Sequence, residues 1–203
     1  NANCSIEDLV EKFYNALEND HNYYVLFLDT HKAFDSIDHN FIKAVLRKIG
    51  MPDWFLNVVE GLLHDIRVKL ILPGKHRSSL RIERGVKQGC PLSPLLFILC
   101  YDVLLTRMAQ IDGHDDYAFA DDLAMGSDSI TPLMNCLLQV GKFSSFSGLG
   151  YNLKKTTIMT THTPTEADQF ALKLAGANKL RFTEAATYLG VRMGRKIGMV
   201  EVF

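Results

Sequence analysis

No apolar run in this sequence reaches the ~20 residues that a membrane-spanning helix requires. The longest candidate, "PLLFILCYDVLL", is interrupted by Asp102 and fits a buried helix better. The chain also lacks an initial Met and a secretory signal, since it opens with Asn1 and a polar stretch. We therefore expect an intracellular piece of a longer protein that does not act at a membrane.

Zinc-type patterns are also absent from the sequence. The four cysteines are widely separated and make no CxxC pair, and the seven histidines form no HExxH or HxH pattern. We interpret the cysteines as reduced thiols of an intracellular protein and the histidines as surface or loop residues. The chain has no internal repeat, and its single tryptophan, Trp54, is interpreted as a core residue.

The net charge is small, −1 in 203 residues, which taken alone argues against a nucleic-acid-binding protein. The distribution of charge argues otherwise, because residues 66–87 are mainly basic and residues 112–128 contain no Lys or Arg. One basic and one acidic segment suit a polyanion held beside a metal site, although two solvated loops of opposite sign explain the same pattern. The basic residues are Arg67, Lys69, Lys75, Arg77, Arg81, Arg84 and Lys87, against Glu83; the acidic ones are Asp112, Asp115, Asp116, Asp121, Asp122 and Asp128.

The apolar pattern predicts an α+β fold. "YYVLFLD", residues 23–29, is a buried strand that ends at Asp29, and residues 115–126 form a hairpin with Asp121 and Asp122 at its tip. Ser5 and Asp8 have the spacing of a capping box before the first helix. Further helices are predicted over 38–49, 52–63, 91–110, 131–147 and 165–175, and strands over 66–72, 78–84, 151–161, 180–183 and 187–193, with "PGKH" as a turn. This order favours a mostly antiparallel sheet with helices on one face.

The hairpin tip places two carboxylates inside the apolar run "YAFADDLAM", which costs stability unless they are solvated, paired or bound to a cation. If the first strand lies beside this hairpin, Asp29 and Asp121 can share a pair of divalent cations, which two-metal phosphoryl transfer holds about 3.5–4 Å apart. Mg²⁺ suits such a sparse carboxylate site. Adjacent strand residues point to opposite faces, so we expect Asp121 to be the primary ligand and Asp122 to be peripheral. An ordinary acidic turn is the alternative.

Five segments follow one another along the chain: "FLDTHKAFDSIDH", "RGVKQGCPLSPLLFILCYDVL", "YAFADDLAM", "SGLGYNLKKTTIM" and "YLGVRMG". Together they resemble motifs A to E of reverse transcriptases, most closely those of non-LTR (LINE-type) retrotransposons. "QGCPLSPLLF" followed by "FADDL" is highly specific, and the resemblance covers roughly residues 5–195. We place motif A at 24–39, motif B at 84–97, motif C at 117–125, motif D at 148–159 and motif E at 188–194.

The resemblance implies a right-hand polymerase palm that copies an RNA template by adding dNTPs to a DNA primer. It implies that Asp29, Asp121 and Asp122 are catalytic metal ligands, with two Mg²⁺ ions for which Mn²⁺ can substitute. It also implies a nuclear location, because LINE-type elements work on chromosomal DNA.

Other roles follow from the resemblance in the same way. Phe34 matches the bulky residue that closes the site against a ribose 2′-hydroxyl, and Gln88 and Gly89 match the motif B pair at the nucleotide and template. Lys155 matches the motif D lysine at the departing pyrophosphate. Core packing for Phe34 and a solvated strand-end position for Lys155 are the alternatives.

Nucleic-acid contacts are expected from motif E, which matches the primer grip, and from the basic residues before motif B, whose phosphate contacts would depend on salt. Hairpin packing is the alternative for motif E. Asp35 and Asp38 are typical of the family, but their spacing suits helix capping, so we favour structural roles for them. The expected contacts are Arg81, Arg84, Lys87, Tyr188, Leu189 and Gly190.

The sequence departs from the family in two respects. Phe119 stands where the family more often has Tyr, a change that keeps the ring. The full fingers and the thumb are absent from residues 1–203, so we expect a single palm domain with partial fingers that needs the rest of a polyprotein.

Three hypotheses are compatible with these observations. The first is an RNA-directed DNA polymerase, and the second is a catalytically incompetent truncated fragment that keeps the palm fold and at most binds nucleic acid. The third is another palm-type phosphoryl-transfer enzyme such as a nucleotide cyclase, against which Gln88-Gly89 and "PLSPLLF" argue strongly. The intact carboxylates favour the first hypothesis, whereas the missing fingers and thumb argue against efficient activity of this chain alone.

Overall fold

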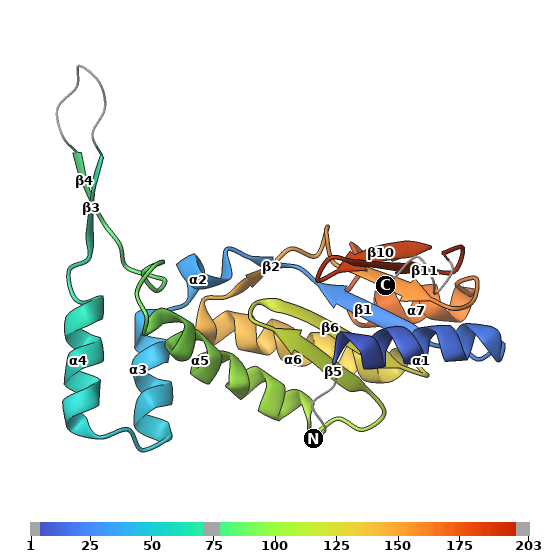
Figure 1. Ribbon diagram of the computed structural model, residues 1–203, viewed down its shortest axis with the longest axis horizontal. Helices are drawn as coiled ribbons and strands as arrows, with labels where there is room; N and C mark the ends of the chain where they lie inside the picture. The colour runs from blue at the N-terminus through green and yellow to red at the C-terminus, as the bar shows by residue number, and fades with distance from the viewer. Residues whose placement is uncertain (1–4, 71–77, 198–203) are drawn as a thin grey trace. The chain divides into compact units, whose positions relative to one another are not determined.

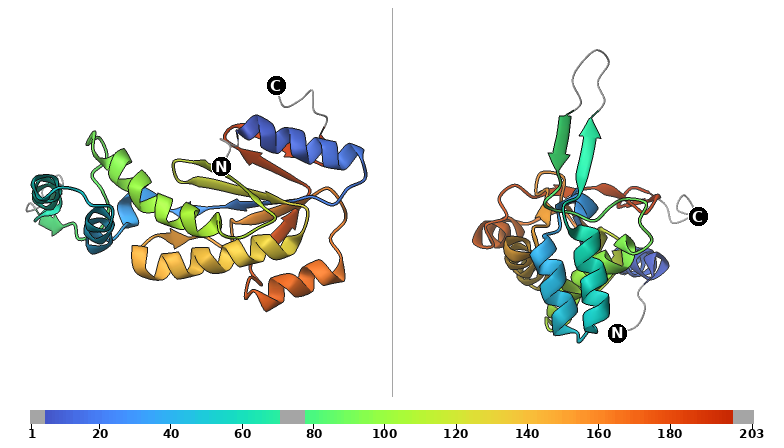
Figure 2. Two further views of the ribbon diagram at one scale, coloured as in Figure 1. Left: turned by 90° about the horizontal axis from the view of Figure 1, so that it is seen from below. Right: turned by 90° about the vertical axis from the view of Figure 1, so that its left-hand side faces the viewer.

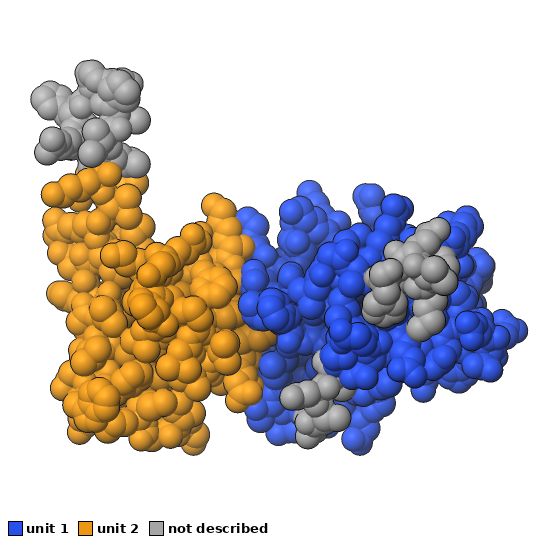
Figure 3. All heavy atoms as spheres, viewed as in Figure 1, with its two compact units in different colours: residues 1–31, 104–142, 151–203 blue, residues 32–103, 143–150 orange. Residues whose placement is uncertain are grey.

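The computed structural model describes residues 5–70 and 78–197. The chain forms two compact units, which Figure 3 shows in different colours. Unit 1 contains residues 1–31, 104–142 and 151–203, and unit 2 contains residues 32–103 and 143–150.

Most of the predicted elements are present with small changes in their ends. The helices are α1 (Ile6–Glu18), α2 (Ala33–Ser36), α3 (His39–Lys48), α4 (Asp53–Leu63), α5 (Ser93–Met108), α6 (Ile130–Ser147) and α7 (Glu166–Leu174). The strands are β1 (Tyr24–Leu28), β2 (Thr30–His31), β3 (Arg67–Leu70), β4 (Ser78–Arg81), β5 (Asp115–Phe119), β6 (Asp122–Ser127), β7 (Gly150–Tyr151), β8 (Thr157–Thr160), β9 (Arg181–Thr183), β10 (Ala185–Tyr188) and β11 (Val191–Gly194). Among the residues described, no helix is long and apolar enough to cross a membrane.

Unit 1 is built around a five-stranded sheet in the order β5-β6-β1-β8-β9 (Figure 1). β1 pairs antiparallel with both β6 and β8, and β5 pairs antiparallel with β6. β8 and β9 run parallel, so the sheet is mixed. The prediction of a mostly antiparallel sheet is confirmed.

Strand β1 is apolar on both sides because it lies between two layers of helices. Val25 belongs to a buried cluster with Phe13 of α1. Tyr24 points the other way, and its hydroxyl donates a 2.8 Å hydrogen bond to Asp168 of α7. Figure 2 shows α1 on one side of the sheet and α6 and α7 on the other. The helices, expected on one face, therefore cover both, since a continuous apolar strand has two faces to bury.

Two of the predicted strands in unit 1 are interrupted by turns. The strand expected over 151–161 is divided into β7 and β8, and the amide of Lys155 donates to the carbonyl of Asn152 at 2.9 Å between them. The strand expected over 187–193 is the hairpin of β10 and β11. Its two turn residues, Leu189 and Gly190, have φ values of +49° and +85°, as a tight hairpin turn requires. Leucine gives no turn signal, which explains why the sequence pattern missed this reversal.

Helix starts follow local hydrogen bonds that the sequence indicates. The capping box at Ser5 is confirmed: its hydroxyl accepts from the amide of Asp8, and the Asp8 carboxylate accepts from the amide of Ser5 at 2.8 Å. Asp38 caps α3 as predicted, because its carboxylate accepts hydrogen bonds from the amides of Asn40 and Phe41. Such caps contribute roughly 1 kcal/mol each.

Unit 2 contains α2, the paired helices α3 and α4, and the hairpin of β3 and β4 (Figure 1). Ile42 and Leu46 of α3 and Val59 of α4 are fully buried. The expected "PGKH" turn lies outside the described residues. Neither α2 nor β2 was predicted, because elements of four and two residues carry too little periodicity.

The prediction for one side chain was wrong, and a second side chain is more buried than expected. Trp54, interpreted as core, is 67% exposed, because α4 is apolar on more than one face and its sequence does not show which face is buried. His114, interpreted as a surface or loop residue, lies in the loop before β5, but its side chain is only 2% exposed, and its Nε2 lies 3.2 Å from Oδ1 of Asp116. A histidine with a carboxylate partner can be buried where an unpaired one cannot.

Candidate active site

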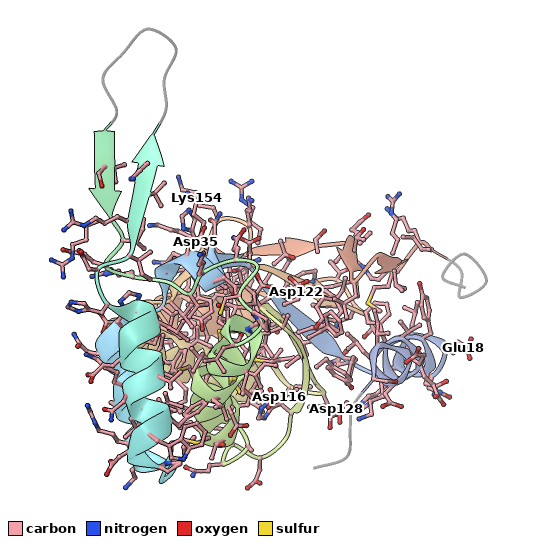
Figure 4. All side chains as sticks on the ribbon, turned by 60° about the vertical axis from the view of Figure 1, so that its left-hand side comes forward. Glu18, Asp35, Asp116, Asp122, Asp128 and Lys154 are labelled. Carbon is pink, nitrogen blue, oxygen red and sulfur yellow. The ribbon has the colours of Figure 1, made fainter. Side chains whose placement is uncertain are left out.

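Asp29 directly follows β1, and strand pairing brings the hairpin tip beside it. Leu28 of β1 is in register with Leu123 of β6, so Asp122, the first residue of β6, is adjacent to Asp29. Both aspartates line a cavity of about 250 Å³ together with Lys155. Figure 4 labels Asp122 at this edge of the sheet. The structure thus brings together three residues that the sequence predicted to be catalytic.

The carboxylates at this cavity repel one another. Burial raises the pKa of Asp122 above its usual value, and the charges of Asp121 and Asp29 raise it further. Clustered carboxylate oxygens are the donors that Mg²⁺ prefers, and a divalent cation would relieve their repulsion. The donor chemistry therefore fits Mg²⁺. Within residues 5–70 and 78–197, however, no group of three or more His, Cys, Asp or Glu side chains is arranged to hold a metal ion.

Asp121 occupies the turn of the hairpin and not a strand. Phe119 pairs with Asp122, which leaves Ala120 and Asp121 as a two-residue turn. Ala120 has a φ of +53°, a left-handed conformation that costs a residue with a Cβ roughly 1 kcal/mol or more. Strand alternation does not apply in a turn, so it gives no reason to call Asp122 peripheral, and Asp122 is the member of the pair that lines the cavity.

Two hydroxyl groups hold the backbone of this tip: that of Thr30, which the sequence did not indicate, and that of Tyr188, which was predicted to contact nucleic acid and not this hairpin. Oγ1 of Thr30 donates to the carbonyl oxygen of Asp121 at 3.1 Å. The hydroxyl of Tyr188 donates to the carbonyl oxygen of Tyr117 at 2.7 Å, and the carbonyl oxygen of Asp122 lies 3.4 Å away. These contacts join residues that are 91 and 71 positions apart in sequence, so no local pattern could reveal them.

The backbone of Asp29 is held from the side opposite the hairpin. Its amide donates to Oγ1 of Thr156 at 3.2 Å, and its carbonyl accepts from the amide of Asn152 at 2.8 Å. Lys155 lies in the same turn, between these two anchoring residues. The segment that supplies the ammonium group is therefore tied directly to the strand end that supplies the first carboxylate.

In motif E the hairpin turn is exposed, whereas the side chain of Tyr188 is buried. Tyr188 is only 7% exposed, and its ring lies 5.7 Å from that of Phe27. Burial raises the pKa of its hydroxyl, with the charge of Asp122 as the second cause. Leu189 is 40% exposed beside Gly190 at the hairpin tip. A nucleic acid that reached this hairpin would meet the turn and not the Tyr188 side chain.

Unit 2 contains a second and larger cavity, of about 780 Å³, with mainly basic charged groups. All three predicted phosphate contacts line it, as does Gln88. Two acidic side chains, Asp35 and Glu83, are also in its wall. The basic lining residues are Arg67, Arg81, Arg84 and Lys87.

The predicted nucleotide-contacting residues of unit 2 have distinct surroundings. Phe34 is half-buried and stacks on Phe97, with ring centroids 4.6 Å apart. The side-chain amide of Gln88 donates to the carboxylate of Asp35 at 3.3 Å. Gly89 has a φ of +84° and open space where a Cβ would lie, so the backbone there is accessible. Asp35 is thus not a helix cap, in contrast to the capping role that its spacing suggested.

Backbone hydrogen bonds join the motif A and motif B segments within unit 2. The amide of Val86 donates to the carbonyl of Phe34, and the amide of Gly85 donates to that of Ile37, both at 2.7 Å. The imidazole Nε2 of His39 also lies 2.7 Å from the carbonyl oxygen of Gly85. These contacts fix the loop that carries Gln88 against α2 and the start of α3.

Solved structures of low sequence identity share this fold. Apo telomerase from Candida Tropicalis matches 98% of the chain with a TM-score of 0.67 at 13% identity, over 34% of its own length. Telomerase from Candida Tropicalis in complex with a TWJ fragment of telomeric RNA matches 98% of the chain with the same TM-score, over 33% of its own length. The chain has the mixed α/β fold of the telomerase reverse transcriptase domain.

Sequence comparisons point in the same direction. A Pol polyprotein from the type-1 retrotransposable element R2 of Popillia japonica is 35% identical over 66% of the chain and 20% of its own length. The Pol polyprotein from the type-2 element R2DM of Drosophila melanogaster is 31% identical over 93% of the chain and 19% of its own length. The chain spans only about a fifth of these relatives. The family model "Reverse transcriptase (RNA-dependent DNA polymerase)" matches residues 2–193, and the chain therefore belongs to the reverse transcriptase family, related to the Pol proteins of non-LTR retrotransposons.

Proposed function

We propose that this chain is the catalytic core of a non-LTR retrotransposon reverse transcriptase. It transfers a nucleotide from a dNTP to the 3′-hydroxyl of a DNA primer on an RNA template. The observation that supports this proposal most directly is the cavity shared by Asp29, Asp122 and Lys155, in a chain of the reverse transcriptase family. The proposed domain is a palm with partial fingers over residues 1–203, with the motif ranges given above, and it works with the rest of a polyprotein.

The carboxylates are the proposed metal ligands. Asp29, Asp121 and Asp122 would hold two Mg²⁺ ions, or Mn²⁺ in their place. Bound metal would lower the pKa of the primer hydroxyl and offset the charge that develops on the phosphates. Burial raises the pKa of Asp122 most, and the charges of Asp121 and Asp29 raise it further; this repulsion between carboxylates supports a cation at this position.

The other residues bind and orient the substrates. Lys155 provides a positive charge on the wall of the same cavity, where it can bind or protonate the departing pyrophosphate. In unit 2, Gln88 and Gly89 contact the incoming nucleotide and template, and Phe34 excludes a ribose 2′-hydroxyl. The proposed nucleic-acid contacts are Arg81, Arg84, Lys87, Leu189, Gly190 and, through its backbone, Tyr188; a nuclear location is proposed with them.

Primer extension tests the proposal. The parent chain is incubated with an RNA template, a DNA primer, dNTPs and Mg²⁺ or Mn²⁺, beside the Asp29→Asn and Asp121→Asn variants. Asp128→Asn is the matched control, because this aspartate belongs to unit 1 and its side chain is 72% exposed, in contact with His21. We expect extension by the parent and by the control, and none by the two site variants.

The same experiment decides between the two functions that the sequence left open. Extension that the site variants lose establishes the polymerase. If neither the parent nor the control extends the primer, the chain alone is the catalytically incompetent fragment. Extension that persists in both site variants would contradict the assignment of these carboxylates.

A further inference from the structure

The hairpin tip that carries Asp121 and Asp122 is held by side chains from two other elements of unit 1. Thr30, immediately after Asp29, donates its hydroxyl to the carbonyl oxygen of Asp121 at 3.1 Å. Tyr188 of β10 donates its hydroxyl to the carbonyl oxygen of Tyr117 at 2.7 Å. Both hydrogen bonds end on backbone carbonyls of the hairpin. They therefore act on the path of the chain and leave the carboxylate oxygens available to a ligand.

The hairpin tip needs such support, because its backbone conformation, its weak packing and its charges all disfavour the observed position beside Asp29. Ala120 is held in a left-handed conformation, and Phe119 beside it is 66% exposed and so contributes little packing. The register of β1 and β6 places Asp122 opposite Asp29, and like charges at opposed strand positions repel each other. A two-residue turn under this repulsion would move away from Asp29 if only the strand ladder held it.

The two hydroxyl groups oppose this movement from two different parts of unit 1, the residue after Asp29 and the end of β10. Thr30 is the next residue after Asp29, so its hydrogen bond limits the separation between the Asp29 backbone and the Asp121 backbone. Tyr188 is buried, with its ring against Phe27 of β1, and its hydroxyl ties the Tyr117 carbonyl of the hairpin to the end of β10. A buried hydrogen bond of this kind is directional and keeps its geometry when solvent moves.

We propose that Thr30 and Tyr188 are positioning residues, whose hydroxyl groups hold the backbone of the carboxylate tip beside Asp29 and thereby favour the binding of a divalent cation. This inference rests on the proposed function, since it concerns the same carboxylates. It assigns Tyr188 a task inside the protein, in addition to any contact that its hairpin makes with a primer.

The test is Mn²⁺ binding to the full chain without nucleic acid, followed by electron paramagnetic resonance. Thr30→Val and Tyr188→Phe remove one hydroxyl each while keeping the shape of the side chain. Thr30→Ser restores a hydroxyl at the first position. Thr161→Val is the control, because the Thr161 hydroxyl donates a comparable 2.7 Å bond to the carbonyl of His21, away from the tip.

We expect Thr30→Val and Tyr188→Phe each to raise the Kd for Mn²⁺ about two- to tenfold, as the loss of one net hydrogen bond predicts. Thr30→Ser should recover most of the parent affinity, and Thr161→Val should keep it. Melting temperatures in EDTA are recorded for every variant. A merely structural role would lower them and leave the Kd unchanged, and that result would overturn the inference.

The remaining outcomes separate the inference from the function on which it rests. If the parent binds Mn²⁺, Asp121→Asn does not, and both hydroxyl variants bind as the parent does, the inference is overturned and the proposed function stands. If the parent binds no Mn²⁺, both are overturned. If Tyr188→Phe fails to fold, the comparison of Thr30→Val with Thr30→Ser, at a partly buried position, is sufficient to support or overturn the inference.

Discussion

Gly85 lies directly against the backbone of Asp35. A Cβ at position 85 would be 2.6 Å from the carbonyl oxygen of Asp35 and 2.7 Å from its Cα. Gly85 also has a φ of +83°, which residues with a Cβ rarely adopt. Because the neighbouring atoms are backbone, neither a rotamer change nor a small shift can make room. This contact is what allows the loop that carries Gln88 to pack against the segment that carries Phe34.

Gly85→Ala should therefore be strongly destabilising. We expect the free energy of unfolding to fall by more than about 2 kcal/mol, the sum of backbone strain and a clash that only backbone movement can relieve. Gly50→Ala is the matched control, since Gly50 has a φ of +80° and a Cβ at this position would meet no atom within 4 Å. The control should lose only about 1 kcal/mol. Urea unfolding followed by circular dichroism measures both, and equal losses would contradict the role of the close contact.

The pair formed by the buried His114 side chain and the partly buried Asp116 predicts a specific dependence of stability on pH. The carboxylate of Asp116 raises the pKa of His114 from 6.5 to about 10, with Cys136 as the next cause and burial opposing both. The folded protein thus binds this proton more tightly than the unfolded chain. The resulting stabilisation is complete below pH 6.5 and is lost as the pH rises from 6.5 towards 10. Urea unfolding at intervals across this range should show stability falling with pH.

Asp116→Asn tests the origin of that pH dependence. Removing the carboxylate leaves a buried imidazole without its counter-charge, so we expect a loss of about 3 kcal/mol at pH 6. The decline in stability above pH 6.5 should become shallower in the variant, because the pKa of His114 returns towards its ordinary value. A parallel decline in the parent and the variant would show that another group, such as a cysteine thiol, causes it.

The hydrogen bond between Gln88 and Asp35 predicts a change in substrate binding without a change in stability. Both side chains are exposed and their atoms are 3.3 Å apart, so Asp35→Ala should alter the free energy of unfolding by less than about 1 kcal/mol. A carboxylate only accepts hydrogen bonds, so it turns the NH₂ group of Gln88 towards itself and the oxygen away. Without Asp35 that orientation is no longer fixed.

Single-nucleotide extension measures the consequence. If Gln88 contacts the nucleotide as proposed, Asp35→Ala should raise the KM for dNTP about two- to fivefold and leave kcat nearly unchanged. Asp35→Asn keeps an acceptor oxygen and should fall between the parent and the alanine variant. A loss confined to kcat, or identical effects of the two substitutions, would contradict this account.

Much of the fold could be predicted because the decisive signals are local. The hairpin expected over 115–126 is formed by β5 and β6, since two short apolar runs flank a polar tip. The caps at Ser5 and Asp38 follow from residue types three positions apart or fewer. Where the polypeptide reverses without Gly, Pro or Asn at the first turn position, as at Leu189, the pattern gave one strand in place of two.

The hydrogen bonds that hold the candidate site in place could not be predicted in the same way. Thr30 and Tyr188 donate hydrogen bonds to backbone carbonyl oxygens. Because every residue has a carbonyl, the residue type of the acceptor gives no signal in the sequence. The pair of Gln88 and Asp35 spans 53 positions and depends on the close approach at Gly85. The motifs therefore name the candidate site residues, whereas tertiary structure is needed to name the residues that hold them in place.

The repulsion at the hairpin tip predicts a variant that is more stable and less active than the parent. The pKa of Asp122 is raised by burial first and then by the charges of Asp121 and Asp29, so the folded protein takes up its proton more readily than the unfolded chain. Stability contributed by this group is present at low pH and is lost as the pH rises through the raised pKa. At neutral pH the tip is therefore under electrostatic strain.

Asp121→Asn removes one of the repelling charges, and we expect it to raise stability at pH 7 in EDTA by up to about 1 kcal/mol, a modest gain because Asp122 is exposed. The gain should shrink as the pH is lowered towards 4, where protonation of the carboxyls relieves the same repulsion in the parent. Asp128 is exposed and is not among the charges that raise the pKa of Asp122. Asp128→Asn should therefore change neither the stability at pH 7 nor its dependence on pH. Thermal melts at pH 4, 5, 6 and 7 give the comparison. If the variant is less stable than the parent at every pH, the interactions of the Asp121 side chain stabilise the fold by more than its charge repulsion destabilises it.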